Sequence, residues 1–194
     1  MTVEKYRGVI DPIFMTTEVP AGELRVARGV ILSPCGHRAL MGQISKQAKN
    51  TADWGMLEFL GGKQESGLTL VDTVKKECLE EAGVQVLVQE NGVHVASQVL
   101  RNLPQSVHNG LTKHTFAFVG NLSDESQVPR RSPEHIWVGW VAVREIINDA
   151  SKRIKFRADT YATLARLAAH TGVFPMVTVS DRLVLEATAT TDVR

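Results

Sequence analysis

The chain has 194 residues, of which 43% are hydrophobic and 22% are charged, and its formal net charge is +1. This length supports one domain with a substantial core, and the near-neutral charge gives no reason to expect a nucleic-acid or membrane partner. With only two cysteines, Cys35 and Cys78, the chain cannot build a disulfide framework or a four-cysteine zinc site, so we expect a cytoplasmic setting. We expect no signal peptide and no membrane span, because no apolar run approaches ~18 residues.

Apolar runs and turn residues predict a chain that mixes strands with helices. Residues 1–22 form a lead-in with one short strand near residues 7–10. Runs rich in Val, Leu and Ile predict strands at 24–33, 38–45, 56–60, 84–88, 94–101, 114–119 and 136–143, the first two as a hairpin. Helical patterns occur at 70–82, 144–150 and 157–170. Residues 102–113 and 121–133 read as loops, and 173–194 form a C-terminal extension with a β-prone run at 176–179 and a polar tail. An α+β or α/β domain over 23–172 accounts for this order.

The helix predicted at 70–82 has a recognisable start, end and inner face. Thr69 and Asp72 have the spacing of a capping box, and Gly83 is suited to end the helix in a left-handed conformation. An apolar stripe at helical spacing is formed by Val71, Val74 and Cys78. We therefore expect the thiol of Cys78 to lie in the core as a small apolar group.

Three carboxylates share the face beside this stripe, because residues at i, i+3 and i+4 are neighbours on a helix: Glu77, Glu80 and Glu81. In one interpretation Lys75, Lys76 and solvent neutralise an ordinary surface face. In the other, a hard divalent cation binds there, since the Gly61-Gly62 turn before the helix brings backbone carbonyls close to the carboxylates. Hard cations in enzymes usually act on phosphates, so the second interpretation predicts phosphate chemistry.

The segment GGKQESGLTLVDTVKKECLEEAGV, residues 61–84, resembles the signature of the Nudix hydrolase family, G-x5-E-x7-R-E-U-x-E-E-x-G-U, where U is bulky and aliphatic. At the required spacing the chain supplies Gly62, Glu77, Glu80, Glu81, Gly83 and Val84. Leu68 replaces the first Glu of the signature, Lys76 replaces the Arg, and Cys78 replaces a bulky aliphatic residue. In the family that Glu and Arg are thought to brace the loop against the helix, and Glu65 could partly substitute here.

The resemblance implies an α/β/α sandwich with a mixed β-sheet. It also implies a hydrolase that cleaves the pyrophosphate bond of a nucleoside diphosphate linked to another moiety, such as a nucleotide sugar, ADP-ribose or a nucleoside triphosphate. One to three Mg²⁺ or Mn²⁺ ions would be held by the Gly61 carbonyl and by the carboxylates of Glu77, Glu80 and Glu81. The larger members of the family that the chain resembles often dimerise, so a homodimer stays open, whereas no nucleic-acid or membrane partner is implied.

Several catalytic roles remain open at this stage. Glu81 or Glu77 could orient the attacking water, and Glu134 is our candidate for a further acidic residue outside the signature, with Glu125 as the runner-up. The changes at Leu68 and Lys76 keep open a non-hydrolytic domain that binds a nucleotide or regulates another protein. An unrelated α/β domain with an acidic helix is a third hypothesis, and it predicts no pocket beside the carboxylates.

Further residues could contact a nucleotide, although a structural or solvated role is the more common one for each. Phosphate contacts are conceivable for His114, His135, Arg130 and Arg131. Trp137 and Trp140 differ by three positions, so in a strand they point to opposite faces, and either could pack in the core or stack on a base.

Overall fold

The computed structural model describes residues 10–46, 53–100, 108–150, 152, 154–170, 173–174 and 177–190. Seven strands form one mixed sheet: β1 (Glu23–Leu32), β2 (Arg38–Ile44), β3 (Leu57–Phe59), β4 (Val86–Val88), β5 (Val93–Val99), β6 (Thr112–Leu122) and β7 (His135–Ala142). The helical elements are a 3-10 turn, η1 (Pro12–Phe14), and four α-helices: α1 (Leu70–Ala82), α2 (Val143–Asp149), α3 (Ala158–His170) and α4 (Val179–Thr190).

The sheet is mixed because β1 and β6 run parallel while the pairs that involve β2, β4 and β5 are antiparallel. The predicted hairpin of β1 and β2 is confirmed, with Leu32 opposite Ala39 near its turn. Further along, β2 pairs with β3, while β7 pairs with its other edge from Arg38 to Ile44. The chain after β3 then lies against β1, where Gly29 N–H donates to the Leu60 carbonyl at 2.8 Å and Ala27 N–H donates to the Gly62 carbonyl at 2.9 Å. The glycine turn is therefore anchored to the middle of the sheet.

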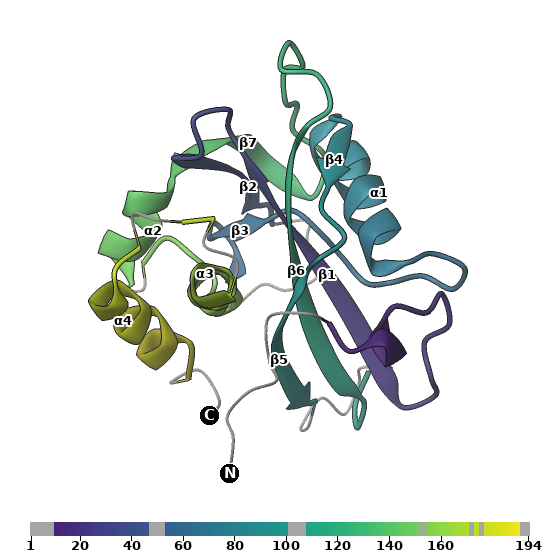
Figure 1. Cartoon of the computed structure of the whole chain (residues 1–194). Helices are drawn as coiled ribbons and strands as arrows, with labels where there is room; N and C mark the ends of the chain where they lie inside the picture. The colour runs from purple at the N-terminus through teal and green to yellow at the C-terminus, as the bar shows by residue number, and fades with distance from the viewer. Residues whose placement is uncertain are drawn as a thin grey trace.

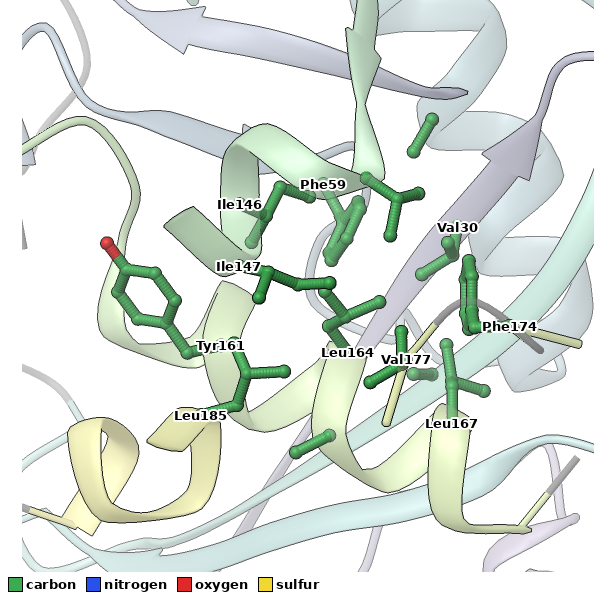
Figure 2. Close-up of a cluster of buried hydrophobic side chains, with 14 of the residues drawn as sticks. Val30, Phe59, Ile146, Ile147, Tyr161, Leu164, Leu167, Phe174, Val177 and Leu185 are labelled. Carbon is green, nitrogen blue, oxygen red and sulfur yellow. The ribbon is translucent and has the colours of Figure 1, made fainter. Parts of the chain in front are cut away.

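Helices cover both faces of this sheet, which confirms the predicted α/β/α sandwich (Figure 1). Side chains of β1 alternate between the two faces because successive residues of a strand point in opposite directions. Ala27 and Ile31 belong to the core under α1, and Val30 and Leu32 belong to the core on the opposite face. Figure 2 shows this second core, in which side chains of α2, α3 and α4 meet residues of the sheet.

The residues before and after the predicted domain also pack onto it. Ile10 is buried in the core under α1. Phe174, Val177 and Leu185 are buried in the opposite core (Figure 2). The strand expected near residues 7–10 lies outside the described residues except for Ile10, as do residues 102–107 of the first predicted loop.

The β-prone run at 176–179 forms no strand in its described part, because Val179 begins helix α4. Residues 175–176 lie outside the described part of the chain, and Val177 and Thr178 do not form a strand. The physical reason is a capping box. Asp181 N–H donates to the Thr178 hydroxyl at 3.1 Å, and Thr178 N–H donates to the Asp181 carboxylate at 2.9 Å. These two bonds satisfy amides at the helix start and outweigh a short β-prone pattern. Within the described ranges, no helix has the length and apolar character needed to cross a bilayer.

Candidate active site

Helix α1 has the predicted bounds, Leu70–Ala82, because its local signals are strong. The Thr69 hydroxyl accepts from Asp72 N–H at 3.0 Å and donates to the Asp72 carboxylate at 2.7 Å. Gly83 ends the helix with φ at 66°. The Cys78 side chain is buried, as predicted, and burial raises the pKa of its thiol. The inner face thereby fixes the rotation of the helix, and this rotation turns the carboxylates toward the glycine turn.

Glu81 is the most deeply placed of the three predicted carboxylates, with 5% of its surface exposed. Its Oε2 accepts a hydrogen bond from Gly61 N–H at 2.9 Å. Burial raises the pKa of Glu81 well above its ordinary value, because this single backbone bond and the nearby Arg28 only partly compensate for lost hydration, and the Glu58 carboxylate adds repulsion. Glu81 is therefore a carboxylate that lacks sufficient positive charge around it.

Glu77 is half-buried and lies against the backbone of Gly62. A Cβ atom on Gly62 would be 2.1 Å from Oε1 of Glu77, so a larger residue at position 62 would push this carboxylate out of its present place. Burial raises the pKa of Glu77, and the carboxylates of Glu80 and Glu134 raise it further. The structure thus brings Glu134 into the electrostatic field of Glu77, although the two residues are far apart in sequence.

Glu80 is exposed and pairs with Lys76 at 3.4 Å. The same Lys76 ammonium donates to Glu65 Oε1 at 2.8 Å, which joins the loop to the helix. This contact is consistent with the idea that Glu65 partly substitutes for the Glu that Leu68 replaces. The Leu68 side chain cannot take part in such a bond, but its carbonyl accepts from the buried Gln64 amide at 2.7 Å. The two-pronged Arg–carboxylate contact of the family is therefore replaced by the Lys76–Glu65 ion pair and by the hydrogen bond from the Gln64 amide to the Leu68 carbonyl.

An ion network that the sequence reasoning missed lies behind the glycine turn. Nη1 of the buried Arg28 donates to the Gly61 carbonyl at 2.8 Å and to the Phe59 carbonyl at 3.2 Å. The same guanidinium pairs with Glu58 at 3.1 Å and with Asp159 of α3 at 3.2 Å. The carbonyl predicted as a metal ligand, that of Gly61, thus accepts a hydrogen bond from Arg28. The arginines within the Val- and Leu-rich strand, Arg25 and Arg28, were the available signal, since a buried charge requires partners.

The Glu58 carboxylate connects this network to β7 and α3. It faces His135 Nε2 at 3.4 Å and accepts from Arg157. Burial works to raise the pKa of Glu58, but Arg28 and these two further partners outweigh it and lower the pKa to about 2. Burial likewise works to lower the pKa of Arg28, and the carboxylates of Glu58 and Asp159 overcome it and raise the pKa. Arg28 and Glu58 are therefore both ionised at neutral pH.

A cavity of about 760 Å³ opens beside Glu77. Four carboxylates and one ammonium group line it among the described residues: Glu18, Glu23, Glu65, Glu77 and Lys63. This finding is contrary to the third hypothesis, which predicted no pocket there. An acidic cavity repels phosphate, so a phosphorylated ligand requires added positive charge at this site.

The carboxylates fit a hard divalent cation in chemistry, because oxygen donors with raised pKa values gain from a neighbouring positive charge. Among the described residues, however, no three acidic, histidine or cysteine side chains converge in the manner of a ready metal site. Glu80 is held by Lys76, and Gly61 O by Arg28. The structure therefore brings Glu77 and Glu81 to the glycine turn and leaves Glu80 at the rim.

The remaining candidates fall in different places. Glu125 is exposed, and Arg130 N–H donates to the Ala82 carbonyl at the end of α1 at 2.8 Å. His114 lies away from the carboxylates, where its Nδ1 is 2.9 Å from the Ser97 hydroxyl. Trp140 packs against the core under α1, and Trp137 is 41% exposed. The opposite orientation predicted for the two tryptophans is consistent with this difference.

The family model described as the NUDIX domain matches residues 23–165. A search of curated proteins found no match. Similar solved structures include a Nudix hydrolase from Nitrosomonas europaea, with 16% identity over 76% of this chain and 89% of that chain and a TM-score of 0.55. The Nudix hydrolase RenU from M. smegmatis shares 15% identity over 80% and 89%, with a TM-score of 0.56. The MutT protein from Methanosarcina mazei Go1 shares 16% over 91% and 100%, with a TM-score of 0.50. These structures share the fold, and the family match spans most of the sequence: the chain belongs to the Nudix family.

Proposed function

We propose that this chain is a Mg²⁺- or Mn²⁺-dependent pyrophosphohydrolase that cleaves a nucleoside diphosphate linked to another moiety. Nudix hydrolases are generally pyrophosphohydrolases that act on small nucleotide-derived substrates and use divalent metal ions. One observation carries the proposal for this chain: the carboxylates of Glu77 and Glu81 lie against the Gly61-Gly62 turn, and Glu77 lines an acidic cavity beside it.

The metal would be held mainly by Glu77 and Glu81, with Glu80 as a further ligand. When bound, a divalent ion supplies a Lewis acid that neutralises phosphate oxygens and lowers the pKa of an attacking water. The protein's own contribution is to hold the carboxylates in place, through the Gly61 N–H bond to Glu81 and the close packing of Glu77 on Gly62.

Two acidic residues are candidates to position the water or accept its proton. Burial raises the pKa of Glu81, and a carboxylate with a raised pKa is a better proton acceptor than an ordinary one. Glu134 is exposed and lies within the field of Glu77, which supports a place at the same site. We assign the first role to Glu81 and keep Glu134 as the further acidic residue.

The test is hydrolysis of a panel of nucleoside triphosphates, ADP-ribose, nucleotide sugars and dinucleotides with Mg²⁺ or Mn²⁺. Glu81→Gln is expected to lower turnover at least about 100-fold while the protein stays folded. Glu90→Gln is the matched control, because Glu90 is exposed and is not among the residues that line the cavity beside Glu77. Equal turnover in Glu81→Gln and the wild type would refute the assignment. The panel also separates the substrate classes, for which we name no preference.

A second candidate, a nucleotide-binding domain without turnover, is favoured by one specific observation. The positive groups at the glycine turn belong to the protein itself, since Arg28 bonds the Gly61 carbonyl and Lys76 bonds Glu80. Binding of a nucleotide without hydrolysis of any compound, in a folded protein supplied with metal, would support this candidate. We expect either activity to be cytoplasmic, and sedimentation would decide between a monomer and a homodimer.

A further inference from the structure

A second cavity, of about 620 Å³, lies at the end of β2 near the start of β7, and we call it the Trp54 cavity. Its lining is Ser45, Lys46, Trp54, Arg131, Ser132, Pro133, His135 and Ile136. The volume is within the range of about 300–1,000 Å³ that small-molecule sites occupy. Among these described residues there are two cationic side chains and no carboxylate, so the cavity differs in sign from the acidic one beside Glu77.

Trp54 gives the cavity a flat aromatic surface. The indole is 49% exposed, which is unusual for so large an apolar side chain. Lys46 Nζ lies 4.3 Å from the centre of the ring, in a cation–π contact. A half-exposed aromatic ring with an ammonium group over one face suits a ligand that stacks a planar ring on the other face and carries negative charge.

Ser45 and His135, which also line the cavity, are held in place by hydrogen bonds and close packing. Ser45 N–H donates to the Glu134 carbonyl at 2.8 Å, and the Ser45 hydroxyl donates to the Pro133 carbonyl at 2.7 Å. His135 is 1% exposed and packs over Gly42, where a Cβ atom would be 2.3 Å from its ring. Its Nδ1 is buried and has no hydrogen-bond partner among the described residues. This part of the lining is therefore ordered before a ligand binds, and it includes the buried Nδ1 of His135.

The segment 130–136, which supplies much of the cavity lining, connects the cavity to the carboxylates of α1. It begins at Arg130, whose N–H bonds the last turn of α1 at 2.8 Å, just after Glu81. Glu134 lies between two lining residues, and its charge acts on Glu77. On the other side, His135 Nε2 faces Glu58 of the network behind the glycine turn. One short segment therefore carries lining residues of the Trp54 cavity and, in Glu134, a carboxylate that acts on the proposed metal site.

We propose that the Trp54 cavity binds the nucleoside monophosphate half of the substrate, with the base stacked on Trp54 and the phosphate facing Lys46 and Arg131. This inference rests on the proposed function for the reaction that follows, and it names the residues that recognise the substrate. An acidic site for the metal and a basic, aromatic site for the nucleotide then divide the substrate between them.

Binding can be measured without turnover, with nucleoside 5′-monophosphates as probes, the full chain and EDTA. We expect at least one nucleotide to bind and to quench tryptophan fluorescence. By calorimetry, Trp54→Ala should weaken binding about 10-fold or more, whereas Trp54→Phe, which keeps a ring for stacking, should retain most of it. Lys46→Gln and Arg131→Gln should each weaken binding at least about 3-fold, with reduced salt dependence. Circular dichroism checks that each variant folds.

Matched controls identify the surface. Trp137→Ala removes an indole of similar exposure that lines a different cavity on β7, and it should bind as the wild type does. Ribose 5-phosphate and glucose 1-phosphate lack the base, so they should bind at least about 10-fold more weakly than the best nucleotide. The proposal is overturned if these sugar phosphates bind as well as the nucleotides, or if binding is unchanged in Trp54→Ala. It is also overturned if only Trp137→Ala loses binding, or if no nucleotide binds at about 10 mM, a weak-binding limit.

The two proposals can fail separately. Nucleotide binding that depends on Trp54, together with no hydrolysis of any compound, would support the cavity and refute the pyrophosphohydrolase. Hydrolysis with unchanged KM and unchanged binding in Trp54→Ala would support the reaction and refute the cavity. If both proposals are correct, Trp54→Ala raises KM with little change in kcat, because the indole contacts a part of the substrate that does not react.

Discussion

Replacing Arg28 with methionine tests whether the ion network behind the glycine turn stabilises the fold. Methionine keeps an apolar stem in the core and removes the guanidinium. The change leaves Glu58 and Asp159 without their contacts at 3.1 and 3.2 Å, and the Gly61 carbonyl without its donor at 2.8 Å. Both carboxylates keep a second partner, because Arg157 contacts Glu58 and lies 3.7 Å from Asp159.

Loss of one partner of a buried ion pair typically costs 3–5 kcal/mol, and the remaining Arg157 contacts reduce this to about 2–3 kcal/mol here. For a chain of this size, that corresponds to a fall in Tm of roughly 4–12 °C.

The pH dependence gives a second magnitude. The pKa of Glu58 falls from 4.5 to about 2 on folding. A pKa lowered in the folded state stabilises the protein above the unfolded pKa, and this contribution is lost as the pH falls toward the folded pKa.

Urea unfolding of the wild type and Arg28→Met at pH 7, 5.5 and 3 measures this contribution. The gap in unfolding free energy should be largest at pH 7 and 5.5 and should shrink at pH 3, where Glu58 begins to protonate in the variant but not in the wild type. Arg144→Met is the control, since Arg144 is exposed and pairs with Asp181 at 3.2 Å, and it should cost less than about 1 kcal/mol. A gap of the same size at all three pH values, or none, would refute the role of the network.

Three further outcomes follow from the site and the core. In metal-free protein, Glu81→Gln should raise Tm at high pH, because burial penalises the ionised carboxylate of the wild type. This gain in Tm should shrink as the pH falls through the raised pKa of Glu81 and should vanish below 4.5, the pKa of the unfolded state. A variant that melts below the wild type at pH 8 would contradict this. Gly62→Ala should fold normally but lower kcat at least about 10-fold, because its Cβ would lie 2.1 Å from Oε1 of Glu77 and would push that carboxylate aside. Full activity would argue against Glu77 as a ligand. Maleimide should label the exposed Cys35 in native protein and the buried Cys78 only in denaturant, as mass spectrometry of the two peptides can show.

Local signals were sufficient to predict the helix that carries the carboxylates. The cap at Thr69, the stop at Gly83 and the apolar stripe act over a few residues, so they can be read from a short window of sequence. The same window contains Glu77 and Glu81, which is why the candidate site was predictable in part. The strands were also recognisable from their apolar runs, whereas α4 was missed because its capping box was not recognised between β-prone residues.

The sequence by itself determined the family, the mixed sheet with its helices and the carboxylates at the glycine turn. Only the tertiary structure decided which charges meet. Arg28 reaches Gly61 because the chain after β3 lies against β1, and it reaches Asp159 because α3 covers that face. Trp54 and Arg131 line one cavity because β2 pairs with β7. Propensities and periodicities act between neighbours along the chain, whereas the partners of a buried charge or an exposed indole depend on strand register and on contacts between distant segments.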